Sequence, residues 1–185
     1  DLLQPTARSQ RERHLLERLA AFSAMAAYQR FERFRERVSG SADPPPDTAS
    51  RERDGLYRAF VADMFDGQLV RFLAELPVLA RHLQLLVDTW TEATGELLER
   101  LALDLATIQG TMGLETPPGR VREITSGLSD RHHRGRQVAT LTFESGLRLV
   151  YKPRTVALEQ AFADLVEWLG QAGLDNPPAT PRNVA

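Results

Sequence analysis

The stretch from Ser129 to Arg154 constrains the fold more than any other part of the chain. Two runs of strand-forming residues, Val138–Phe143 and Leu147–Tyr151, are separated by Glu144-Ser145-Gly146. β-Branched and aromatic residues in runs of this length favour strands, and a serine followed by a glycine suits a tight reversal. The stretch therefore predicts an antiparallel β-hairpin.

The loop length sets the register of this hairpin. If Ser145 and Gly146 alone form the loop, the cross-strand pairs on one face are Phe143 with Arg148, Leu141 with Val150 and Ala139 with Lys152. Lys152 would then project from a largely apolar surface beside a small alanine, which leaves room for a ligand. The following proline cannot donate a ladder hydrogen bond, so regular pairing is expected to end at this point.

Lys152 is also the only lysine among 23 basic residues. Arginine is planar and always charged, whereas the lysine ammonium is a compact charge that loses its proton when its pKa is lowered. A phosphate site or catalytic site can therefore require lysine where arginine has replaced it elsewhere. The alternative is a single lysine retained by chance at a strand end.

Helical patterns fill the first part of the chain. Ser9-Gln-Arg-Glu12 reads as a capping box, and the apolar residues after it recur at helical spacing, so we expect a helix running to about Val38. Residues 39–47 contain three consecutive prolines and predict a linker. A helical pattern begins again at Leu56 and continues to Pro77, where the proline either ends the helix or starts a new one. The alternating arginines and glutamates of the first helix indicate a solvated face rather than a nucleic-acid face.

A second long helix is predicted to carry core residues. Its apolar stripe is formed by Trp90, Thr94, Leu97, Leu98, Leu101, Leu105 and Ile108. Gly110 and Gly113 close the helical region, a short strand is predicted at Val121–Ile124, and Thr155 is expected to cap a final helix. The predicted fold class is α+β, predominantly helical, with a helical region over 1–113 and a β-containing region over 114–185.

The polar loop from Gly127 to Gly135 allows three interpretations. Asp130, His132 and His133 together suggest a metal site, but their spacing matches no strong ligand motif and lacks a distant partner. The arginines of the loop suggest nucleic acid, but no aromatic residues are interleaved with them. The third interpretation is an active-site loop that approaches a phosphate, with Gly135 permitting close backbone approach.

Composition removes several classes of function. A net charge of −2 implies no bulk attraction to nucleic acid or anionic membranes. The absence of cysteine excludes disulfides and thiolate metal sites, and no apolar run is long enough to span a bilayer. We expect a cytoplasmic protein. The chain starts without methionine and ends in a proline-rich stretch, so we also expect it to be a piece of a longer protein.

The central stretch resembles the dehydratase domain of class II lanthipeptide synthetases, the LanM type. In that family an Asp-x-His-x-x-Gly-Arg-x-Val element precedes a hairpin that ends in Val-Tyr-Lys-Pro-Arg. The matching residues here are Asp130, His132, Gly135, Arg136 and Val138, then Ser145-Gly146, then Val150 through Arg154, then the segment from Phe162 to Leu169. The resemblance covers roughly residues 56–170.

The resemblance implies a fold related to kinases, with residues 114–185 as part of a kinase-like small lobe. A strand-end lysine followed by a helix is similar to that lobe, in which the lysine pairs with phosphates and a helix glutamate orients it. Glu159 is the candidate partner of Lys152. It could equally be a solvent-exposed residue in the first turn, where a carboxylate suits the helix dipole.

The implied reaction has two steps. The enzyme transfers phosphate from ATP to serine or threonine of a ribosomal precursor peptide, then removes the α-proton and expels phosphate to give dehydroalanine or dehydrobutyrine. The resemblance assigns Lys152 to ATP phosphate and Asp130 and His132 to elimination. Gly135 is a further phosphate-binding candidate, and Arg154 either holds phosphate or braces the strand end. His133 matches no fixed family position.

The departures from the family are as informative as the matches. The magnesium ligands and catalytic aspartate of kinase-like enzymes are expected outside this chain, as are the rest of the dehydratase domain and a zinc-dependent cyclase domain. The implied partners are a precursor peptide with its leader and those missing parts. The alternatives are a non-catalytic helical module that binds peptide or protein, and a degenerate family member that binds ATP without dehydrating.

Overall fold

The computed structural model describes residues 1–39, 49–127 and 135–184. The fold is α+β and 66% helical, with helices in the N-terminal region and a small antiparallel sheet followed by a helix. The α+β class predicted from the sequence is therefore confirmed. The predicted linker over 39–47 lies almost entirely outside the described residues.

The chain divides into two compact units. Unit 1 contains residues 1–14 and 89–185, and unit 2 contains residues 15–88. Two long helices, α1 (Pro5–Ser39) and α4 (Pro77–Met112), contribute to both units. The C-terminal part of α4 therefore belongs to the same unit as the sheet. The division predicted from the sequence assigned the whole helix to the helical region 1–113. The domain division itself stays a prediction.

The start of α1 differs from the prediction. The helix begins at Pro5, so Ser9 and Glu12 lie inside it and do not form a capping box. Proline suits the first helical position because its missing N–H would have no intrahelical partner there. Gln10 therefore lies within the helix, and its side chain accepts a hydrogen bond from the backbone N–H of Ile124 in β1 at 2.8 Å. The helix ends at Ser39, close to the predicted end at Val38.

The described residues of unit 2 are helical except for Leu76, which separates α3 from α4. Unit 2 contains α2 (Ala49–Asp63), a kinked π-helical turn η1 (Met64–Gln68) and α3 (Leu69–Glu75). Gly67 has a φ of 92°, which produces the kink between α2 and α3. The ring of Phe60 in α2 meets Phe31 and Phe34 of α1 edge-on, with centroids 5.3 and 5.5 Å apart. As predicted, the helical pattern restarts at Pro77.

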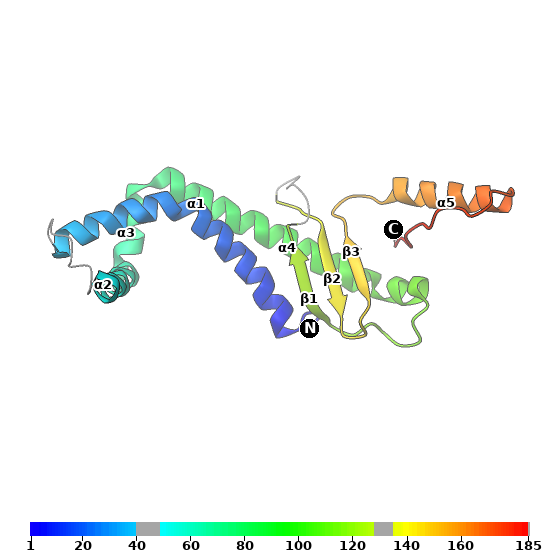
Figure 1. The fold of residues 1–185 in the computed structure, drawn as a ribbon, viewed down its shortest axis with the longest axis horizontal. Coiled ribbons are helices and arrows are strands. Elements are labelled where there is room, and N and C mark those ends of the chain that lie inside the picture. Colours follow the sequence, from blue (N-terminus) through cyan, green and yellow to red (C-terminus); the bar gives the residue numbers. More distant parts are fainter. Residues whose placement is uncertain (40–48, 128–134, 185) are drawn as a thin grey trace. The chain divides into compact units, whose positions relative to one another are not determined.

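The sheet of unit 1 has three antiparallel strands in the order β1 (Val121–Ser126), β2 (Ala139–Phe143) and β3 (Arg148–Tyr151) (Figure 1). The predicted hairpin is β2–β3, and the predicted short strand is β1. At the outer edge of β1, Leu3 forms a parallel bridge with Val121. The N–H of Val121 donates to the carbonyl of Leu2, and the N–H of Gln4 donates back to Val121, both at 2.8 Å.

The predicted hairpin register is wrong by one residue. Leu141 lies opposite Leu149, and Ala139 lies opposite Tyr151 rather than Lys152. The reason is a loop of three residues instead of two: the N–H of Phe143 donates to Leu147, and Gly146 adopts a φ of 87°. A left-handed residue at the end of a three-residue loop is the usual way to close such a hairpin. Lys152 consequently lies beyond the paired strand.

Long-range contacts hold the hairpin loop. The Glu144 carboxylate accepts hydrogen bonds from the backbone N–H of Arg120 at 2.8 Å and from the side chain of Gln4. These bonds, that of the Arg120 N–H foremost, lower the pKa of Glu144 below its usual value. A side chain at Gly119 would have no room, because its Cβ would lie 2.6 Å from the Glu144 carboxylate. The loop is thus fixed by residues far away in the sequence.

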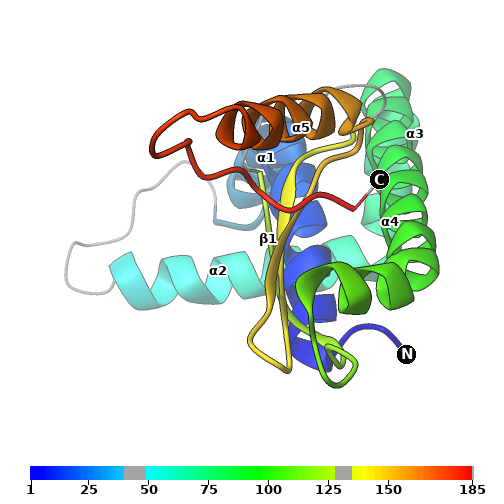
Figure 2. The same ribbon diagram turned by 90° about the vertical axis from the view of Figure 1, so that its right-hand side faces the viewer.

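The core of unit 1 lies between α4 and one face of the sheet. Three residues of the predicted apolar stripe, Leu97, Leu101 and Ile108, are buried. They belong to one cluster with residues from the N-terminal segment, α1 and the strands, namely Leu3, Ala7, Val121, Ile124, Ala139, Leu141 and Phe143. The prediction that the stripe forms core is confirmed. The last helix, α5 (Ala157–Gln171), follows β3 after a short connection (Figure 2).

Truncation of this core should destabilise the chain strongly. Leu101 is 6% exposed, whereas Leu103, two residues along the same helix, is 80% exposed. Because a buried leucine leaves a cavity, Leu101→Ala should lower the free energy of unfolding by about 2–5 kcal/mol. Leu103→Ala should change it by less than about 0.5 kcal/mol. Urea unfolding of both variants measures the difference, and equal effects would contradict this assignment of the core.

Candidate functional site

Lys152 stands directly after β3 and meets the first turn of α5. Its Nζ donates to Oε1 of Glu159 at 2.8 Å. The side chains of Lys152 and Glu159 are 33% and 18% exposed. The pairing of Lys152 with Glu159 is thus present, and Glu159 is not a solvent-facing residue of the first turn.

Arg154 shares the same carboxylate. Its guanidinium donates to Oε1 of Glu159 at 2.6 Å and to Oε2 at 3.3 Å. This two-pronged contact matches the interpretation of Arg154 as a brace between the strand end and the helix. Two cations then face one carboxylate, which leaves an excess of one positive charge at the strand end.

The two cations change the acidity of Glu159. The hydrogen bond from Lys152 is the main cause that lowers the pKa of Glu159 from 4.5 to about 2, and Arg154 lowers it further in the same direction. Glu159 therefore stays ionised through the physiological range. An ionised carboxylate keeps the lysine ammonium oriented beside β3.

Lys152 also lines a cavity of about 890 Å³ between α4, the hairpin and the C-terminal residues. The lining of the cavity combines apolar side chains with four basic residues and one acidic residue, Asp104. Apolar lining residues include Leu101, Ile108, Leu141, Leu149 and Val156, and the basic ones are Arg100, Arg148, Lys152 and Arg182. Such a lining suits an amphipathic ligand with a negatively charged part. Tyr151 also lines it, and burial raises the pKa of its phenol.

Gly135, the glycine of the Asp-x-His-x-x-Gly-Arg-x-Val element, lies against α4. Its φ is 84°, a conformation that favours glycine, and a Cβ there would lie 3.5 Å from Thr89. The next residue, Arg136, donates from Nε to Oε2 of Glu96 at 2.5 Å. The other oxygen of Glu96 pairs with Arg100 at 2.6 Å.

Sequence reasoning missed Glu96 as a contact of the motif. A glutamate four residues before an arginine on a helix predicts their mutual pair, Glu96 with Arg100. It gives no sign of Arg136, which lies 40 positions away. Only the packing of α4 against the sheet brings these residues together.

Asp130 and His132, the predicted elimination residues, lie outside the described residues, as does His133. Their distance from Lys152 therefore stays untested. In the parts of the chain that the structure describes, no group of three or more His, Cys, Asp or Glu side chains could hold a metal ion. Within the same parts, none of the helices has the length and apolar character needed to cross a membrane.

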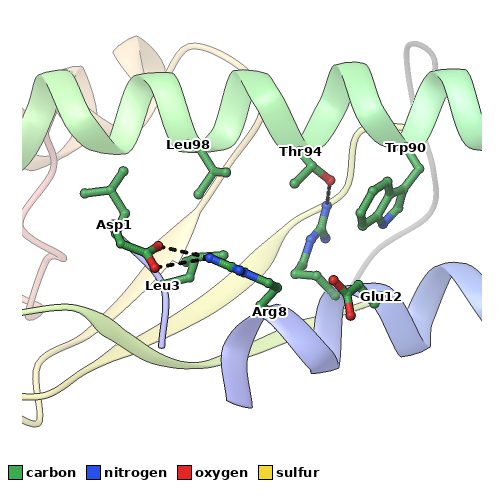
Figure 3. Close-up of a pocket in the computed structure, with 9 residues that line it drawn as sticks. Asp1, Leu3, Arg8, Glu12, Trp90, Thr94 and Leu98 are labelled. Atoms are coloured by element: carbon green, nitrogen blue, oxygen red, sulfur yellow. Dashed lines mark hydrogen bonds and ion pairs between the residues drawn. The ribbon is translucent and has the colours of Figure 1, made fainter. Parts of the chain in front are cut away.

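A second, smaller pocket of about 200 Å³ lies between the N-terminal segment, the start of α1 and α4 (Figure 3). Arg11 joins three elements beside it: it donates to Thr94 of α4 at 2.6 Å and to Ser126 of β1 at 2.8 Å, and its guanidinium lies over the ring of Trp90. Asp1 and Arg8 form an exposed ion pair at the rim. These contacts tie α1 to α4 and to the sheet.

Unit 1 is thus a small antiparallel sheet on a long helix, with a lysine at a strand end that is held by a glutamate of the next helix. Residues 76–185, more than half of the chain, match the family described as Domain of unknown function (DUF4135), and the chain belongs to this family. The domain is associated with lanthipeptide synthetase-like proteins. No curated protein matches the chain significantly.

The acidity of Glu159 provides a direct test of the site. In the native chain, carboxyl ¹³C NMR should show Glu159 titrating with a pKa of about 2. Lys152→Met should raise this pKa toward 4.5, because the main hydrogen bond to the carboxylate is lost. Since the folded-state pKa is lowered, the contact stabilises the fold above about pH 4.5, and this contribution is lost as the pH falls toward 2.

Arg148→Met is the matched control for this titration. Arg148 lines the same cavity but stands at the start of β3, and it is not among the residues that lower the pKa of Glu159. Its removal should leave the pKa of Glu159 low. An unchanged titration in Lys152→Met would contradict the ion pair.

Proposed function

We propose that the chain is part of the dehydratase domain of a class II lanthipeptide synthetase. The domain would transfer phosphate from ATP to serine or threonine of a ribosomal precursor peptide and then eliminate the phosphate. One observation carries the proposal: the single lysine of a chain in this family sits at a strand end and pairs with a glutamate of the following helix. The cytoplasm is the expected compartment, because ATP and unmodified precursor peptides occur there.

The charges around Lys152 are suited to a nucleotide phosphate. Lys152 and Arg154 share Glu159, so one positive charge is uncompensated before a ligand enters. Arg154 can keep its two-pronged hold on Glu159 while the Lys152 ammonium turns to a phosphate oxygen. ATP supplies the transferable phosphoryl group as a substrate. Lys152 neutralises charge on it and positions it, which is the main protein contribution to phosphoryl transfer.

The elimination step needs different groups. A base takes the proton from Cα of the phosphorylated residue, the electron pair forms a carbon–carbon double bond, and the bond from Cβ to the phosphate oxygen breaks. The leaving phosphate departs with that oxygen. Resemblance to the family assigns this step to Asp130 and His132, and the neutral-range pKa of histidine side chains suits proton transfer.

The described residues do not form a complete active site under this proposal. The resemblance to kinase-like enzymes implies that the ligands for Mg²⁺ lie outside this chain. The zinc-dependent cyclase domain and the leader of the precursor peptide are proposed partners on the same basis. No step in our proposal is routed through a metal held by this chain.

A second candidate function is a helical module that binds peptide or protein without catalysis. The observation that favours it is the apolar face of α5, where large side chains remain exposed, namely Leu158, Phe162, Leu165 and Trp168. Such a face on a helix with glutamate and aspartate elsewhere is typical of a contact surface. A degenerate family member that binds ATP without dehydrating would carry the same Lys152 arrangement.

Mass spectrometry of the substrate peptide separates these functions. The full-length protein, ATP and Mg²⁺ are incubated with a precursor peptide that contains leader, serine and threonine. Native protein should remove water from the peptide. Lys152→Ala should give no modification, because phosphoryl transfer fails, and His132→Ala should leave phosphorylated peptide, because elimination fails.

The control is Arg122→Ala, an exposed change in β1 that our proposal keeps out of the site. It should dehydrate the peptide like the native protein. A peptide left unmodified by native protein would favour the non-catalytic module, and ATP binding without modification would favour a degenerate member.

The isolated 185-residue chain should not dehydrate the same peptide. The reason is that the catalytic aspartate and magnesium ligands of kinase-like enzymes are expected outside it. Incubation of the chain with peptide, ATP and Mg²⁺, followed by mass analysis, tests this. Loss of water by the isolated chain would show that our account of the missing parts is wrong.

A further inference from the structure

One edge of β3 is open. The strand order is β1-β2-β3, so β3 is the outermost of the described strands (Figure 1). The N–H of Phe143 donates to the carbonyl of Leu147 at 2.9 Å, and hydrogen-bonded pairs alternate with non-bonded pairs along an antiparallel ladder. Leu149 therefore bonds to β2, whereas the backbone N–H and C=O groups of Arg148 and Val150 point away from it. An edge of this kind can pair with a further strand.

The space beside this edge has an apolar lining. Ala139 and Leu141 of β2 are 1% and 3% exposed, but Tyr151 and Leu149, their partners in β3, are only half-buried. Both of these β3 residues line the cavity of about 890 Å³. The apolar residues of α4 that line the same cavity are Leu101, Ile108 and Met112. Alternate side chains of one more strand would fill this space and cover the half-buried residues of β3.

The charges around the cavity favour an acidic occupant. Four basic residues line it, against one acidic residue, Asp104. Arg100 pairs with a glutamate of α4, and Lys152 pairs with a glutamate of α5. Within the described ranges of the chain, Arg148 and Arg182 form no ion pair, although Arg182 donates to the carbonyl of Thr111. Two arginines are thus available to carboxylates, and a basic occupant would be repelled.

The cavity also offers a buried hydrogen-bond donor. Nδ2 of Asn183, which lines the cavity, is buried and has no hydrogen-bond partner in the part of the chain that the structure describes. Buried polar groups in folded proteins are normally hydrogen-bonded. The carbonyl and carboxylate oxygens of an acidic peptide are acceptors of the kind that this amide lacks.

We propose that the open edge of β3 and the cavity beside it bind an extended segment of another polypeptide, in which apolar residues alternate with aspartate or glutamate. The segment pairs with the backbone of Arg148 and Val150 and turns its apolar side chains toward α4. Its acidic side chains lie on the opposite face of the sheet, to which the Arg148 side chain points, since Leu149 packs on the core. This surface is separate from the exposed face of α5, and the inference does not depend on the dehydratase function.

The first test measures peptide binding to the full-length protein by fluorescence anisotropy. The probe is a fluorescein-labelled heptapeptide, Val-Glu-Val-Glu-Val-Glu-Val. It should bind saturably, and on the order of tenfold more tightly than Val-Lys-Val-Lys-Val-Lys-Val, because the lysines meet like charge. Arg148→Glu should weaken binding of the acidic peptide on the order of tenfold. Arg122→Glu is the matched control and should bind like the native protein, since Arg122 is an exposed arginine of β1 outside the cavity lining.

A second variant, Val150→Pro, tests the pairing of the backbone. Proline has no N–H to donate, and it is tolerated on an edge strand where the N–H points away from the sheet. The β2–β3 ladder should therefore persist, which circular dichroism checks. Loss of one hydrogen bond should weaken binding of the acidic peptide about threefold to tenfold.

Amide exchange followed by NMR in the native 185-residue chain needs no variant. The N–H groups of Arg148 and Val150 should exchange rapidly without peptide and become protected when the acidic peptide is added. Leu149 and Tyr151 should be protected in both states, because they bond to β2.

Four results would overturn the proposal. They are equal affinity for the acidic and basic peptides, native affinity in Arg148→Glu, and unchanged exchange at Arg148 and Val150 with saturating peptide. The fourth is binding by the 185-residue chain but not by the full-length protein, because the edge of β3 would then be covered by another part of the same protein. Dehydratase activity, present or absent, changes none of these readouts.

Discussion

The packing of α4 on one face of the sheet is the interaction on which the rest of unit 1 depends. The sheet has only three short strands, and the apolar stripe of α4 supplies the surface that buries one face of it. Each part of the candidate site is positioned by contacts with this helix or with the sheet that packs on it. Lys152 follows a strand whose inner face packs on α4, Gly135 rests on Thr89, and Arg136 meets Glu96. The helix with no evident chemistry in its sequence is therefore the scaffold of the site.

Local patterns in the sequence were sufficient for the elements themselves. The hairpin and the apolar stripe of α4 follow from periodicity and spacing, because the residues involved are near one another in the chain. The pairing of Lys152 with Glu159 was expected from the similarity to a kinase-like small lobe. The hairpin register was not predictable in this way. It depends on a three-residue loop in which Gly146 has a positive φ and the carboxylate of Glu144 accepts hydrogen bonds from Gln4 and Arg120. Gln4 is remote in sequence, so no local rule includes it.

The candidate site also contains one local and one long-range contact. Lys152 and Glu159 are seven positions apart in the sequence. The pair of Glu96 with Arg136 joins residues 40 positions apart and becomes visible only once α4 lies on the sheet. Glu96 and Glu159 nevertheless have the same arrangement of charges, because each carboxylate pairs with two cationic side chains. Around Glu96 both cations are arginines, which hold fixed planar contacts. Around Glu159 one is the single lysine of the chain, a flexible point charge able to exchange partners.

The bridge between Leu3 and Val121 has a consequence for how the chain acquires its structure during synthesis. The first residues emerge from the ribosome long before residue 121, so the hydrogen bonds of Leu2 and Gln4 must wait until β1 has been made. A contact of such high sequence separation forms late, because the loop between its ends must be closed first. Helices α1 and α4 can form earlier from local contacts alone. Residues 2–4 therefore cannot make these hydrogen bonds until β1 has been synthesised. Their pairing with Val121 is one of the last steps in the folding of unit 1.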